Sequence, residues 1–261
     1  MKLSAAALLF ALFAAIPASS ADLQAVLATP RQRVQTADYR VSGHLVRVDS
    51  SGARTSYAIS VKAHWFPGVL RILVDVAPPS NPVSGTVAAA HAHILLEMRP
   101  TGQSSIRIAH PGDATPHTVP FDMWTDGPLG SGFSYEDFLE EQYFWSGQAV
   151  VDQTKLGARD CDVLKSTPGL ADKTHYSEVR TWLDHTIGFP IYIEKTVKAN
   201  GTVKQFTAFG LRHEGGVWSA SQIEEKNRGQ AGSTLLIIDR GSAKANLGLA
   251  DFSPEQLVRF P

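Results

Sequence analysis

Two histidines with strand spacing are the most direct candidates for metal chemistry. His91 and His93 are two residues apart, so an extended chain places both side chains on one face. Zinc or copper would need a third ligand from elsewhere, and the sequence does not choose among His44, His64 and His110. We therefore expect exposed strand histidines and no metal site.

The paired carboxylates do not form a recognisable acid–base catalyst. Glu140 and Glu141 are adjacent, and adjacent residues on a helix do not face each other. Asp160 and Asp162 flank the only cysteine but have no evident acid or base partner. We expect all four carboxylates to be solvated charges. We expect Cys161 to be an inward-facing strand residue, with a reactive thiol as the alternative.

The segment from Gly130 to Gly132 places a serine between two glycines, which raises the question of a nucleophile elbow. That motif requires Gly-x-Ser-x-Gly between a buried strand and a helix, and the spacing here does not fit. The sequence also contains no phosphate loop, dinucleotide fingerprint or His-Glu-x-x-His helix. We therefore predict no catalytic residues and no cofactor, and expect that the protein is not an enzyme.

The residues after these glycines predict a short helix from Ser134 to Glu141. Ser134 can cap the amide of Asp137, and two acidic residues occupy the positive end of the helix dipole. A surface helix packed on a sheet is the simplest interpretation. Its apolar side would be formed by Phe133, Phe138 and either Phe144 or Trp145.

The N-terminus and the charge indicate an exported protein that does not bind nucleic acid. Lys2, the apolar run Leu3 to Ile16 and the small residues Ser19 to Ala21 read as a secretory signal peptide cleaved after about Ala21. Its removal takes away one lysine and no acidic residue, so the net charge falls from −1 to −2. This charge gives no basic field for nucleic acid. We assign residues 1–21 to the signal and 22–261 to one domain.

Most of the chain alternates apolar and polar residues with period two, which is typical of half-buried antiparallel strands. A helix from Leu23 to Ala28 comes first, and a helix capped by Ser253 comes last. About ten strands lie between them. We expect them at Tyr57–Trp65, Leu70–Val76, two within Ala88–Ile108, Gln148–Gly157, Cys161–Ser166, Val179–Asp184, Phe189–Val197, Thr202–Phe209, Val217–Glu224 and Ser233–Asp239.

One antiparallel sheet of this size should curl, and it has few helices to cover its apolar face. The predicted fold is therefore mainly β, with a hollow that is either packed by side chains or occupied by something else. Aromatic residues near strand ends and the predicted helix could line such a pocket or simply fill a β-core. They are Trp65, Phe66, Trp124, Phe133, Tyr135, Phe138, Trp145 and Trp182.

The segment Leu129-Gly-Ser-Gly-Phe-Ser-Tyr-Glu-Asp-Phe138 resembles the Gly-Ser-Asp-Phe-Ser-Tyr-Glu-Asp-Leu signature of the outer membrane lipoprotein-sorting protein family, relatives of the periplasmic carrier LolA. The signal peptide, the Asn200-Gly201 hairpin and the ending Asp251-Phe-Ser-Pro-Glu-Gln-Leu257 agree with the family in order. Gly132 stands where the family has Asp. Ile94-Leu-Leu-Glu-Met-Arg-Pro replaces the family's aromatic-rich strand.

The resemblance implies a single curled antiparallel sheet that forms an incomplete, half-open β-barrel with short helices as a lid. It also implies a periplasmic carrier that takes a lipid or lipidated protein from an inner-membrane transporter and delivers it to an outer-membrane acceptor. The predicted lipid-binding residues are Ile72, Val74, Ile94, Leu96 and Met98 from the strands and Phe133, Tyr135 and Phe138 from the lid.

Two alternatives remain on the same scaffold. The first is an envelope lipid-sensing or protein-interaction module whose hollow is packed and whose edge strand or loop recognises a partner. The second is an envelope hydrolase, which would need a serine or histidine at a pocket floor with an orienting partner.

Overall fold

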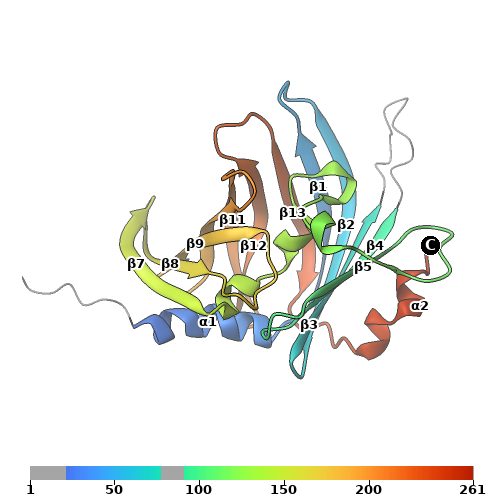
Figure 1. The fold of residues 1–261 in the computed structure, drawn as a ribbon, viewed down its shortest axis with the longest axis horizontal. Helices are drawn as coiled ribbons and strands as arrows, with labels where there is room; N and C mark the ends of the chain where they lie inside the picture. The colour runs from blue at the N-terminus through green and yellow to red at the C-terminus, as the bar shows by residue number, and fades with distance from the viewer. Residues whose placement is uncertain (1–21, 78–90, 261) are drawn as a thin grey trace, which may run out of the picture.

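The strands form one antiparallel sheet that curls around the middle of the molecule (Figure 1). The computed structural model describes residues 22–77 and 91–260. Within this part of the chain, thirteen strands follow the order β6-β5-β4-β3-β2-β1-β13-β12-β11-β10-β9-β8-β7. The two edge strands, β6 and β7, do not pair with each other in the described part of the chain, so the sheet stays open. This confirms the predicted mainly β fold with an unclosed sheet.

The strands are of very different lengths, and the longest lie near the centre of the sheet. They are β1 Asp38–Val48, β2 Arg54–Phe66, β3 Val69–Ala77, β4 Ala92–Met98, β5 Ser105–Ala109, β6 His117–Thr118, β7 Gly147–Leu156, β8 Arg159–Thr167, β9 Tyr176–Asp184, β10 Pro190–Val197, β11 Val203–Glu214, β12 Val217–Asn227 and β13 Ser233–Ser242.

Two meanders, β1 to β6 and β7 to β13, are joined through the pairing of β1 with β13. The register of this pair shifts between Ser42 and Gly43, which marks a bulge. A side chain at Gly43 would overlap the carbonyl oxygen of Ile237, so glycine permits the close approach of the two backbones. The first and last strands of the chain therefore hold the two halves together.

The helices are short and lie around the sheet (Figure 1). Helix α1 (Leu23–Gln35) runs along one end of the sheet, where it contacts β7. Helix α2 (Pro254–Leu257) follows the 3-10 turn η5 (Leu249–Phe252) and packs near β3 and β4. Four more 3-10 turns lie between β6 and β7. They are η1 Phe121–Met123, η2 Pro128–Gly130, η3 Tyr135–Phe138 and η4 Glu141–Phe144.

These four turns and their connections form the covering segment, residues 121–145. The main hydrophobic cluster lies between this segment, α1 and the inner face of the sheet. A second cluster lies on the outer face, where Leu73 and Leu95 pack against Phe252 and Leu257 from the C-terminal turns. The strands near β3 and β4 are therefore apolar on both faces.

Several expected elements differ from those observed. Helix α1 continues through Pro30 to Gln35 instead of ending at Ala28. Strands β1 and β6 were not predicted, although Tyr39, Val41 and Leu45 of β1 alternate on the inner face. The signal peptide, its cleavage after Ala21 and the start of the predicted strand at Ala88 lie outside the described residues.

Candidate functional site

The structure places all eight predicted lipid-binding residues in one hydrophobic cluster on the inner side of the sheet. Two cross-strand pairs, Ile72 with Leu96 and Val74 with Ile94, cover the inner face of β3 and β4, and Met98 pairs with Leu70. From the covering segment, Phe133 is buried, and Tyr135 and Phe138 pack against the cluster while partly exposed. These residues form an apolar surface that is closed over by protein, and lipid binding by them stays a prediction.

The covering segment is held to the sheet by a buried ion cluster centred on Asp137. Its side chain is fully buried, with Oδ1 3.1 Å from Lys195 Nζ and Oδ2 in contact with Lys204 Nζ. The Tyr176 hydroxyl also donates to Oδ1 at 2.6 Å. Burial alone would raise the pKa of Asp137, but the two lysines outweigh it and hold the pKa well below its usual range. The carboxylate is therefore ionised in the folded protein at neutral pH.

The two lysines explain why an acid is needed here. Lys195 of β10 and Lys204 of β11 are direct cross-strand partners, and both are buried on the inner face. Like charges directly opposite each other destabilise a sheet. The Asp137 carboxylate lies between them, so two positively charged side chains of the sheet bind one acid of the covering segment.

Glu136 makes a second anchor one residue earlier. Its carboxylate is buried and accepts from the His175 backbone N–H at 3.0 Å and from the Thr174 hydroxyl. The His175 ring Nδ1 lies 2.9 Å from Oε2, and Phe121 stacks on the same ring. Glu136 is therefore bound by the residues just before β9, whereas Asp137 is bound by β9, β10 and β11.

These anchors explain why the predicted helix from Ser134 to Glu141 is replaced by the turns η3 and η4. Asp137 Oδ2 accepts from both the N–H and the hydroxyl of Ser134 at 2.8 Å, so a cap forms, but the chain is extended again at Leu139. Leu139, Glu141 and Tyr143 are also buried. A continuous α-helix would turn some of these side chains toward solvent. Glu136 and Asp137 lie in the first turn of η3, as expected, but their carboxylates also bind residues outside the covering segment.

Glu225 of β12 lies beneath the Gly132 backbone. It is 2% exposed, and its Oε1 has no hydrogen-bond partner. Burial raises the pKa of Glu225 to about 7, against the pull of Lys204. The Gly132 N–H donates to the Thr234 hydroxyl at 2.8 Å, and a side chain at Gly132 would overlap the Glu225 carboxylate. The resembled signature has aspartate at position 132. Glycine at this position leaves room for the carboxylate of Glu225 in the sheet.

The solvated charges expected at the acid pairs are found only in part. Glu141 is buried, and burial raises its pKa to about 7. Glu140 forms an ion pair with Arg33 of α1 at 2.5 Å, and Asp162 is buried and accepts from Gln153 at 2.7 Å. Asp160 is exposed as predicted. Cys161 is buried, as predicted, on a strand. The expectation failed for Glu140 because its partner Arg33 is 107 residues away in sequence, and for Asp162 because Gln153 of the neighbouring strand β7 binds it.

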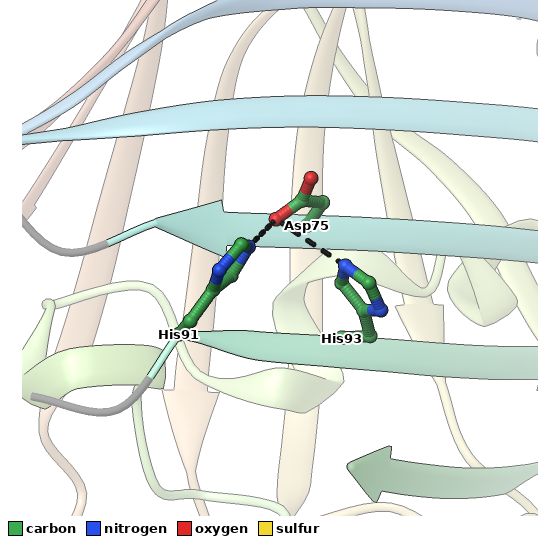
Figure 2. Close-up of side chains that lie close together, drawn as sticks. All are labelled: Asp75, His91 and His93. Atoms are coloured by element: carbon green, nitrogen blue, oxygen red, sulfur yellow. Dashed lines mark hydrogen bonds and ion pairs between the residues drawn. The ribbon is translucent and has the colours of Figure 1, made fainter. Parts of the chain in front are cut away.

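The exposed histidines expected at His91 and His93 are not observed (Figure 2). His93 is 7% exposed, and only 17% of the His91 side chain is exposed. Asp75 of β3, which was not among the candidate third ligands, lies between the two rings. His91 Nε2 is 2.7 Å and His93 Nε2 is 3.6 Å from Asp75 Oδ1.

Sequence reasoning missed Lys195, Lys204, Glu225 and Tyr176, although one signal was present. Lys195 occupies an inward strand position, two residues after Ile193, which packs in the core. A lysine in an apolar strand position requires a buried partner. The identity of that partner could not be read from the sequence, because Asp137 is 58 residues away from Lys195.

Comparison with known proteins gives the fold a class. A domain from Vibrio parahaemolyticus assigned to the outer membrane lipoprotein-sorting proteins superposes with a TM-score of 0.76 and 17% identity, over 91% of this chain and 100% of that one. A DUF1329 family protein from Desulfovibrio piger gives 0.74 and 16%, over 90% and 98%. A LolA superfamily protein from Nitrosomonas europaea gives 0.63 and 14%, over 90% and 99%. The chain has a LolA-like fold, as its resemblance to the family implied.

The family of this particular chain is defined by sequence. Residues 120–259, more than half of the chain, match a family model described as an uncharacterized protein, and the chain belongs to that family. No curated protein matches the sequence significantly. Among the described residues, no helix has the length and apolar character needed to cross a membrane.

Replacing the central acid tests the ion cluster. Asp137→Asn leaves two buried lysines without a counter-charge, so we expect the free energy of unfolding to fall by about 3–5 kcal/mol. Urea unfolding of the chain from residue 22 to 261 measures this loss. Asp160→Asn, which removes an exposed acid, should change stability by less than about 0.5 kcal/mol. Equal stability of the two variants would contradict the anchoring role.

The raised pKa of Glu225 predicts a pH-dependent stability. The folded state holds the proton more tightly than the unfolded chain, so stability is full below pH about 4.5 and is lost as pH rises through about 7. Glutamine does not ionise. We expect Glu225→Gln to match the natural chain at pH 5 and to exceed it by about 1–3 kcal/mol at pH 8. Urea unfolding at both pH values checks this, with Glu224→Gln as control. An equal difference in unfolding free energy between Glu225→Gln and the natural chain at pH 5 and pH 8 would refute this pH dependence.

Proposed function

We propose that the protein is a non-enzymatic periplasmic carrier that binds the acyl chain of a lipid or lipidated protein on the inner face of its sheet. The observation that carries the proposal is an extended apolar face covered by a separate segment, which is anchored by the buried acids Glu136 and Asp137. Support comes from the LolA-like fold and from the neighbour assigned to the lipoprotein-sorting proteins. The exported location rests on the signal peptide predicted for residues 1–21.

The acyl chain would take the place of the covering segment. Five large apolar side chains of this segment are buried, namely Trp124, Phe133, Leu139, Tyr143 and Trp145. At about 1.5–3 kcal/mol each, their exposure would cost about 8–15 kcal/mol. An acyl chain of about sixteen carbons contributes on the order of 12 kcal/mol at ~0.8 kcal/mol per CH₂. Because the two amounts are similar, loading and release are near balance.

A near balance suits a carrier that must both accept and give up its cargo. An inner-membrane transporter would drive opening when it donates the lipid, and an outer-membrane acceptor would take it by offering a better site. The segment is positioned to respond, because its anchors Glu136 and Asp137 are neighbours in sequence and bind the adjacent residues His175 and Tyr176. Displacing the turn η3 releases both.

The closed packing also favours the second candidate, an envelope lipid-sensing or protein-interaction module. In that case the inner face would stay filled by residues such as Phe133 and Tyr143, which are buried in this structure. The two candidates differ in one property: the carrier must open the covering segment, whereas the interaction module keeps it closed.

A reversible cross-link separates them. The position of a Cβ at Gly132 is 3.0 Å from Thr234 Oγ1, close enough for a disulfide between cysteines at these positions. The Glu225 carboxylate, at the end of a flexible side chain, must move aside. In a Cys161→Ala background, we expect Gly132→Cys/Thr234→Cys to bind a fluorescent fatty acid when reduced and to bind it at least tenfold more weakly when oxidised.

Two controls complete the fatty-acid experiment. Cys161→Ala/Gly132→Ala carries a side chain at position 132 without the cross-link, so oxidant should leave its binding unchanged. Equal binding by the oxidised and reduced double-cysteine chain would mean that the acyl chain enters without opening. Failure of the Cys161→Ala chain to bind the probe at all would sink the carrier proposal and favour the interaction module.

A further inference from the structure

A cluster of metal-ligand types lies on the outer face of the sheet, away from the apolar inner face. Asp75 of β3 pairs directly with His93 of β4, and His91 precedes it by two residues, so all three side chains point outward together (Figure 2). Their ligand atoms lie within 4.8 Å of one another. Two imidazoles and one carboxylate are a donor set that binds zinc and related divalent metals.

The ring of His93 is oriented by a backbone carbonyl. His93 Nδ1 lies 2.8 Å from the Leu257 carbonyl oxygen, which only accepts, so Nδ1 must carry a hydrogen. In the neutral ring the other nitrogen, Nε2, then holds a lone pair directed at Asp75 Oδ1, 3.6 Å away. Two acceptors face each other across this gap. A cation between them, or a second proton on the ring, would satisfy both.

The surroundings hold these side chains in place. Phe260 stacks on the His93 ring with centroids 4.1 Å apart and contacts the edge of the His91 ring at 4.9 Å. A carbonyl bond to the remaining nitrogen of a ligating histidine is the usual support of a protein metal site, since it fixes the tautomer and the ring plane. The C-terminal residues thus form one wall of the cluster.

In the part of the chain that the structure describes, the opposite side of the cluster borders a groove. Asp75 also lines a groove of about 310 Å³ on the outer face, whose walls include Ser42, Ser60 and the ion pair of His44 with Asp239. Three protein ligands beside this groove would leave a coordination position for water or for an oxygen of a bound molecule.

We propose that Asp75, His91 and His93 bind one divalent transition-metal ion, with zinc as the ion that the donor set fits best. His93 binds through Nε2, and the fourth position faces the groove. The bound metal would tie the β3–β4 hairpin to the C-terminal residues through the Leu257 carbonyl and Phe260. The site is independent of the inner face, so it stands whether or not the protein carries a lipid.

Titration calorimetry with zinc chloride tests the site on the mature chain without a histidine tag, after chelator treatment and dialysis. We expect one zinc ion per chain. Asp75→Asn and His91→Gln, which keep the size of the side chains, should each weaken zinc binding at least tenfold. His213→Gln removes an exposed histidine elsewhere and should have no effect.

Thermal unfolding guards against variants that fail to fold. Zinc should raise the melting temperature of the natural chain and of His213→Gln, because it binds only the folded state, but not that of folded Asp75→Asn. Cobalt provides a second readout on the natural chain, since a four-coordinate site gives strong visible absorption bands. Absence of stoichiometric zinc in the natural chain, or zinc binding that survives both site variants, would overturn the proposal.

Discussion

The attachment of the covering segment to the sheet depends on one buried carboxylate. Asp137 forms ion pairs with two lysines that face each other across β10 and β11, and neither lysine has another acid bonded to it in the described structure. A buried charge pair adds little net stability compared with apolar packing, but removal of one partner is costly. The cluster therefore specifies where the segment docks more than how tightly the protein is folded. The hydrophobic contacts of Phe133, Leu139 and Tyr143 follow from that docking.

The stability of the packing beneath the covering segment also depends on the protonation of a second buried acid, Glu225. Glu225 lies beside the cluster with an unpartnered oxygen, and burial raises its pKa to about 7. The covering segment passes over it at Gly132, where a side chain would overlap the Glu225 carboxylate. Ionisation of Glu225 at neutral pH thus works against the packing beneath the segment.

The β-architecture was accessible from the sequence because alternation is a local property. The strands from β2 to β5 and from β7 to β13 were located by period-two patterns and turn residues, and the inner face of β3 and β4 was correctly grouped. Strand β1 was missed, and its glycine at position 43 and polar neighbours weaken the pattern. The helix expected after Ser134 became two short turns because partners on other strands, such as Lys204, bind its acids.

From the sequence, only those site residues that are close together along the chain could be grouped. His91 and His93 were recognised as a pair, but Asp75 joins them through strand pairing, which fixes a register the sequence does not state. Likewise the aromatic residues of the covering segment were identified, whereas their anchors were not. Long-range partners are decided by topology, and residue types alone do not determine it.

Movement of the covering segment is what most directly distinguishes a carrier from a permanently packed module. Hydrogen exchange measured by mass spectrometry, with and without a palmitoylated peptide, follows this segment in the natural chain. The carrier predicts faster exchange in residues 121–145 when the lipopeptide is bound, while the amides of β3 and β4 stay protected. Unchanged exchange in residues 121–145 at saturating lipopeptide would contradict it.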